Sequence, residues 1–179
     1  MIERRTIHCT LAAVLLGIAV SAPSGTHASE DEAMTTIHSW LEAHSGTEWS
    51  GPNELWVDPT GNRAEHSDGT LKVEADGIAY TWAWKGTPHR GELRWDDGWT
   101  WTDSWHQPEV VRLEPVRDHG ALLAGEYSYP AGTGPDWHWR IKLAERPDGA
   151  VVLQMTNIAP WGEEARAVRM VVTQAGDGP

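Results

Sequence analysis

Phenylalanine is absent from this 179-residue chain, and cysteine occurs only once, as Cys9. Tyrosine is also scarce, with three residues, whereas tryptophan occurs twelve times. The lone cysteine lies in an N-terminal segment that we expect to be removed, so the mature chain would have no thiol. Disulfides, a cysteine nucleophile and cysteine-based zinc or iron–sulfur sites are therefore excluded for the mature protein.

Long apolar runs are absent beyond the first residues of the chain. The single such run, Thr10–Val20, follows Arg4 and Arg5 and precedes small residues that end at Ala28. This order is typical of a secretory signal peptide, and the run is too short to span a membrane. We expect residues 1–28 to be a signal peptide cleaved after Ala28. The protein would then be exported, either to the periplasm or to the medium.

Positive charge is low, with 14 lysines and arginines against 26 acidic residues and a formal net charge of −12. This balance disfavours nucleic acids and anionic lipid surfaces as partners. Motifs for a phosphate loop, a Gly-x-Ser-x-Gly nucleophile or a His-Glu-x-x-His metal site are also missing. The sequence thus predicts no cofactor, no metal site and no catalytic residue, and it leaves the oligomeric state unassigned.

The remaining chain predicts one helix followed by strands. Ser29–His44 has an apolar stripe that includes Ile37, Trp40 and Leu41, which is typical of an amphipathic helix. After Gly46, turn signals recur every eight to twelve residues, and about ten short strands lie between them. We expect a mostly β fold, a single antiparallel up-and-down barrel. Its predicted parts are an N-terminal helix at 29–45, a barrel at 46–175 and a disordered tail at 176–179.

The alternation of residues predicts an aromatic barrel interior. Tyr80, Trp82 and Trp84 share one face of a strand, and Lys85, which favours water, lies on the other face. The same reasoning along the other strands gives a predicted wall of Tyr80, Trp82, Trp84, Trp95, Trp101, Trp105, Tyr127, Trp137 and Trp139. Three polar residues are candidates to orient a ligand inside it: Asp103, Asn157 and Arg166. His106, which precedes the end of its strand at Pro108, is a candidate rim residue.

Four stretches of sequence together resemble a known family. They are Asp103–His106, Tyr127–Pro130, Asp136–Ile141 and Met155–Glu164 with its continuation to Arg169. In this order they resemble an uncharacterised bacterial family of calycin-like barrels, related in shape to lipocalins and fatty-acid-binding proteins. The resemblance covers roughly residues 34–173 and implies a barrel with a central cavity, but no chemistry. Calycin barrels often begin their first strand with Gly-x-Trp, whereas this chain has one residue more, in Gly46–Trp49.

Three functions stay open at this level. The preferred one is an exported barrel that binds a small hydrophobic or aromatic molecule. The second is a hydrolase or isomerase that uses Asp103 and His106, although regular alternation would put the two on opposite faces. The third is a structural or interaction protein with a filled core. Asp103 itself is either paired internally, with indole N–H groups or an arginine, or is free to anchor a ligand.

Overall fold

The computed structural model describes residues 27–58 and 62–174, with side chains from Thr36 onward. Most of the predicted signal peptide and the predicted tail at 176–179 lie outside these ranges. Within them, one helix precedes eleven strands, in agreement with the prediction of a mostly β chain. The elements are α1 (His27–His44), β1 (Glu48–Leu55), β2 (Glu65–Glu74), β3 (Gly77–Trp84), β4 (Thr87–Trp95), β5 (Trp99–Asp103), β6 (Gln107–Arg112), β7 (Glu114–Pro115), β8 (Leu123–Tyr129), β9 (Trp137–Glu145), β10 (Val151–Ile158) and β11 (Glu164–Gln174).

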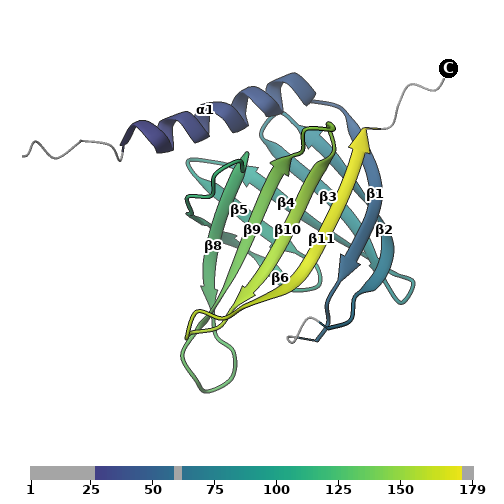
Figure 1. Ribbon diagram of the computed structural model, residues 1–179, viewed down its shortest axis with the longest axis vertical. Coiled ribbons are helices and arrows are strands. Elements are labelled where there is room, and N and C mark those ends of the chain that lie inside the picture. Colours follow the sequence, from purple (N-terminus) through teal and green to yellow (C-terminus); the bar gives the residue numbers. More distant parts are fainter. Residues whose placement is uncertain (1–26, 59–61, 175–179) are drawn as a thin grey trace, which may run out of the picture.

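The strands form one antiparallel up-and-down barrel that is nearly closed (Figure 1). Apart from β6 and β7, each strand pairs with its neighbours in the sequence, and β1 pairs with β11 to join the first and last strands. The seam lies between β6 and β7. Just after β6, the backbone N–H of Leu113 still bonds to Trp99 of β5, and Glu114 then pairs with Glu126 of β8. One continuous segment therefore bridges the seam and leaves little open sheet edge.

Antiparallel pairing puts the turns at two opposite ends of the barrel. The helix α1 lies across one of them, against β2 and β8 (Figure 1). We call this the helix end. The opposite end, called here the far end, carries the turns at 85–86, 104–106, 130–136 and 159–163.

Apolar residues of α1 close the helix end. Ile37 and Leu41 are buried, and the Trp40 indole N–H donates to Glu145 at the end of β9 over 3.1 Å. Trp49, the first tryptophan of the barrel, packs against Trp40 with ring centroids 6.2 Å apart. The additional residue in Gly46–Trp49 therefore does not prevent this tryptophan from covering the end of the barrel. The predicted helix is confirmed, with its start at His27, two residues before the predicted one.

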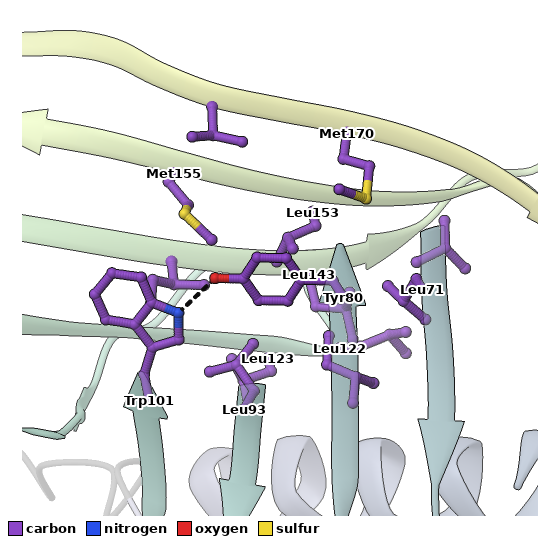
Figure 2. Close-up of a cluster of buried hydrophobic side chains, with 14 of the residues drawn as sticks. Leu71, Tyr80, Leu93, Trp101, Leu122, Leu123, Leu143, Leu153, Met155 and Met170 are labelled. Carbon is purple, nitrogen blue, oxygen red and sulfur yellow. Dashed lines mark hydrogen bonds between the residues drawn. The ribbon is translucent and has the colours of Figure 1, made fainter. Parts of the chain in front are cut away.

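The half of the interior next to the helix is a packed apolar core. Figure 2 shows side chains from strands on both sides of the barrel meeting around Tyr80. The fully buried members include Leu71, Leu93, Leu143, Leu153 and Met170. Each such side chain contributes roughly 1.5–3 kcal/mol through its removal from water. This layer holds the barrel together and forms the floor on which the aromatic residues nearer the far end rest.

Charged residues lie on the outer wall, as the alternation predicted. Arg94 pairs with Glu74, Asp76 and Glu92 on neighbouring strands. Arg140 bridges acidic residues of β8 and β11 in the same way. These exposed ion pairs add little stability each, but they confirm which face of β4 and β9 points outward.

Candidate functional site

Asp103, the last residue of β5, is buried in the barrel and accepts four hydrogen bonds. Its Oδ2 accepts from the Tyr80 hydroxyl at 2.9 Å and from the Trp82 indole N–H at 3.3 Å. Its Oδ1 accepts from the backbone N–H groups of Trp105 and His106 at 2.8 and 3.1 Å. The Trp101 indole N–H in turn donates to the Tyr80 hydroxyl over 2.9 Å, the bond drawn in Figure 2. A carboxylate has about four lone-pair positions, so these bonds use its acceptor capacity.

Asp103 is therefore paired inside the protein, with neutral hydrogen-bond donors. Of the two alternatives left open by the sequence, the structure shows pairing with an indole N–H and a phenol, and no arginine takes part. The two bonds to backbone N–H groups hold the turn at 104–106 as an Asx-type cap. Buried charges need such satisfaction because an unpaired carboxylate in an apolar interior is very costly.

Gly91 makes room for this network. It pairs across the strands with Tyr80, and a Cβ atom at Gly91 would overlap the phenol ring and oxygen of Tyr80. The absence of a side chain lets the tyrosine lie flat against β4 and reach Asp103. The sequence gives little hint of this, because the contact joins two different strands.

His106 does not lie on the opposite face from Asp103, so that expectation is wrong. β5 ends at Asp103, and the turn at 104–106 breaks the strict alternation on which the expectation rested. The His106 ring instead enters the barrel and stacks on Trp139, with centroids 3.8 Å apart and planes 18° apart. The carboxylate of Asp103 contacts the backbone N–H of His106, and the structure shows no hydrogen bond between the carboxylate and the ring.

Four other aromatic rings gather around His106 near the far end. Trp101 stacks with Trp139 at 6.0 Å and 19°, and Tyr127 contacts Trp101 at 5.6 Å. Tyr129 meets the edge of His106 at 5.2 Å. Tyr127 and Trp139 are direct partners across β8 and β9. We call Trp101, His106, Tyr127, Tyr129 and Trp139 the His106 group.

A second aromatic group lies beside the first. We call it the His89 group, and its members are Trp82, Trp84, His89 and Trp105. His89 stacks on Trp82 at 4.5 Å, and Trp105 meets both rings and Trp84 edge-on, the last at 4.3 Å. Trp105 was expected within the inner wall, but it belongs to the turn after β5 and is 39% exposed, so it forms part of the rim. His89 was missed because Lys85–Pro88 reads as a turn. Continuing the alternation of β4 back from Leu93 would have found it.

Unpaired polar atoms concentrate in these two aromatic groups. Among the described residues, six buried side-chain nitrogen or oxygen atoms have no hydrogen-bond partner within the protein. Five of them belong to the His106 and His89 groups: Trp84 Nε1, His89 Nε2, His106 Nε2, Tyr127 Oη and Trp139 Nε1. The sixth is Asn53 Oδ1. Buried polar atoms of native proteins nearly always have partners, so this concentration sets the two groups apart from the rest of the interior.

Burial also shifts the pKa of the titratable groups here. It raises the pKa of Tyr80 well above its ordinary value, and the negative charge of Asp103 adds to the effect. It raises the pKa of Tyr127 and Tyr129 as well. It lowers the pKa of His106, against the opposing effect of Asp103. At neutral pH the interior thus holds neutral phenols and a neutral imidazole around one carboxylate.

Other predicted site residues lie at the edge of this region or away from it. Asn157 is half-buried and accepts a 2.6 Å bond from the Tyr129 hydroxyl, so its Oδ1 is already paired. Trp137 meets the exposed Trp161 edge-on at 5.7 Å on the rim. Trp95 lies at the helix end, where it contacts His38 of α1 at 5.0 Å, far along the barrel from Asp103.

Arg166 does not point into the barrel, so its expected role in orienting a ligand inside the barrel is wrong. The pairing of β10 with β11 shifts register between Met155 and Thr156, and the additional residue of the bulge, Ala167, reverses the direction of the positions beyond it. Arg166 is exposed and lies over the ring of Trp56, 5.7 Å from its centroid. It borders a pocket of about 300 Å³ that Gln154 and Arg169 also line.

Comparisons with known proteins add no relative. No protein-family model matches the chain, and the search of curated proteins finds no match. Within residues 27–58 and 62–174, no helix has the length and apolar character needed to cross a membrane. In the same part of the chain, no three histidine, cysteine or acidic side chains come close enough to hold a metal ion. The site must therefore be interpreted from its own geometry.

Proposed function

We propose that this protein is an exported, calycin-like barrel that binds a small, partly hydrophobic molecule among the His106 and His89 groups. The nearly closed antiparallel barrel supports the likeness to calycins. Binding sites for small molecules are mostly apolar and aromatic, with a few polar groups that fix orientation. The two groups have this composition, whereas the buried side chains next to the helix are mostly aliphatic, together with Trp40 and Trp49.

The concentration of unpaired polar atoms is the observation that carries the proposal. A core made only for stability would satisfy or omit these atoms, because each buried unpaired group costs about 1–3 kcal/mol. The same interior satisfies Asp103 with four donors, so unpaired atoms are not a general feature of its polar residues. A bound molecule with polar atoms of its own would remove the cost.

Native mass spectrometry of protein taken from its own host tests the proposal. We expect a species heavier than the bare chain, with the difference lost on denaturation and recovered as a small molecule. The variant Trp139→Ala, folded by circular dichroism, should carry much less of it. Trp95→Ala at the helix end is the matched control and should keep it. A bare chain from the host, together with no binding in titrations against lipids, porphyrins, aromatics and sugars, would favour a filled structural core.

Export is part of the same proposal and has its own test. The intact mass of the protein recovered from an exporting bacterial host should correspond to a chain that begins at Ser29. Recovery of the uncleaved chain from the cytosolic fraction would contradict export, while leaving the binding site untouched.

Acid–base catalysis by Asp103 and His106 receives little support. Both oxygens of Asp103 are occupied by neutral donors, and its contact with His106 is to the backbone N–H. A general base needs a lone pair within reach of the proton it removes.

A further inference from the structure

Two hydrogen-bond donors of the His106 group have no partner within the protein. The Trp139 indole N–H can only donate, and the Tyr127 hydroxyl has its proton to give. The nearby carboxylate and amide oxygens are already used as acceptors: Asp103 accepts four bonds, and Asn157 Oδ1 accepts from Tyr129. A molecule that pairs with the Trp139 and Tyr127 donors must therefore supply acceptor atoms.

The stacking of the rings disfavours a cationic occupant. Aromatic cages bind cations through free ring faces. In the His106 group, Trp101, His106 and Trp139 stack on one another with planes 18–37° apart, so their facing surfaces cover each other. Trp139 Nε1 and His106 Nε2, on the edges of their rings, are left without partners, whereas the Trp101 indole N–H donates to Tyr80. A cation would also find no unoccupied lone pair on Asp103.

The charge of the site disfavours an anion as well. Asp103 is surrounded by neutral donors, and none of its four hydrogen bonds comes from a lysine or arginine. Arg166, the cation once expected here, is on the outside of the barrel. A second negative charge in this interior would meet an uncompensated carboxylate across a medium of low dielectric constant.

We propose that the His106 group binds a neutral, mostly apolar molecule through a carbonyl-type oxygen that accepts hydrogen bonds from Trp139 Nε1 and Tyr127 Oη. This inference rests on the proposed binding function and narrows its ligand class. Ketones, esters, amides and quinones carry such an oxygen, whereas hydrocarbons, amines and fatty-acid carboxylates do not meet the requirement.

Four compounds on one bicyclic skeleton test the proposal: indanone, indane, aminoindane and indane carboxylate. They offer a neutral carbonyl, no polar group, a cation and an anion respectively. Isothermal titration calorimetry of the protein at neutral pH should find indanone about tenfold or more tighter than indane, because indane leaves both donors buried and unpaired. The amine and the carboxylate should bind more weakly than indanone.

Two variants localise the effect. Tyr127→Phe and Trp139→Phe each remove one donor, and each should reduce the preference for indanone over indane about fivefold with little change in indane affinity. Tyr127→Phe loses an unpaired hydroxyl and should fold normally, so the test does not depend on the tryptophan variant. Trp95→Phe at the helix end is the control and should keep the full preference.

The outcomes separate this inference from the binding function. Equal affinity for indanone and indane, or tightest binding of the amine or the carboxylate, would refute the carbonyl requirement while the site remained a binding site. An unchanged preference in both donor variants would refute the two named donors. Failure of all four compounds to bind would count against the inference and the binding function together.

Discussion

Replacing Tyr80 with phenylalanine removes a single oxygen atom from the centre of the barrel. That oxygen donates to Asp103 Oδ2 over 2.9 Å and accepts from the Trp101 indole N–H over 2.9 Å. All three residues are buried, with exposed fractions of 1–3%. The substitution leaves the ring in place beside Gly91, so the change in stability reports the two hydrogen bonds and not a cavity.

The expected loss follows from those two bonds. A hydrogen bond to a charged group contributes about 1.5–3 kcal/mol, and a buried N–H left without a partner costs about 1–3 kcal/mol. The free energy of unfolding should therefore fall by about 3 kcal/mol or more. With a urea m-value of about 2 kcal/mol/M for a domain of this size, the midpoint should fall by about 1.5 M. Tryptophan fluorescence is a suitable probe of the transition.

Tyr127→Phe is the matched control, because it removes the same atom from a buried tyrosine of the same barrel. The Tyr127 hydroxyl has no partner within the protein, so its loss removes a cost and should leave the midpoint unchanged or raise it. A Tyr80→Phe midpoint within about 0.3 M of the wild type would show that the two hydrogen bonds of Tyr80 contribute little to stability. An equal loss of stability in both variants would show the same.

Three more predictions follow from the interior. Burial lowers the pKa of His106. The neutral His106 ring therefore stabilises the folded protein fully above the unfolded pKa of about 6.5, and this stabilisation is lost as the pH falls below that value. Urea midpoints measured across this pH range should fall less steeply in His106→Phe than in the wild type. The chain has only three tyrosines, Tyr80, Tyr127 and Tyr129, and burial raises the pKa of each. Their stabilising effect is therefore present below pH about 10 and lost as the pH rises, and tyrosinate absorbance should appear only together with unfolding; its appearance in the folded protein near pH 10 would contradict their burial. Gly91→Ala should lower stability by more than about 2 kcal/mol in the wild type and by much less in a Tyr80→Leu background, and equal losses in both backgrounds would remove the role assigned to Gly91.

The sequence predicts the barrel well because alternation is a local signal. Tyr80 and Trp82 are buried inside the barrel, and Trp84 on the same face of β3 packs against the core, as predicted. Lys85 itself belongs to the turn after β3, and its Nζ lies 4.4 Å from the centroid of the Trp84 ring. The helix is predicted for a similar reason, because its apolar stripe is also a local pattern of the sequence. Closure of the sheet follows from the number of strands and the cost of open edges.

The details of the site depend on breaks in alternation that a single sequence does not reveal. The bulge at Ala167 turns Arg166 outward, and the turn after Asp103 brings His106 inward and Trp105 to the rim. Both are departures of one or two residues, yet each reverses the side on which a candidate residue lies. The four-donor environment of Asp103 combines residues from two strands and a turn, so it requires the three-dimensional arrangement.

Four tryptophans show how hydrogen bonding differs between the two ends of the barrel, while Trp82 and Trp101 are paired within the Asp103 network. Those at the helix end, such as Trp40 and Trp49, have their indole N–H groups paired and close the barrel. Trp84 and Trp139, nearer the far end, have theirs buried and unpaired. The difference in hydrogen bonding, more than the number of tryptophans, is what distinguishes a candidate binding region from a core.

The indole N–H signals of a ¹⁵N-labelled sample offer the most direct test of this division. Each tryptophan gives its own signal, so one titration with indanone reports on both ends of the barrel. We expect the Trp139 signal to shift most, with the downfield change expected for a new hydrogen bond, while the signals of Trp40 and Trp49 stay in place. Shifts confined to the helix end, or no shift of Trp139 at saturating indanone, would rule out binding at the His106 group.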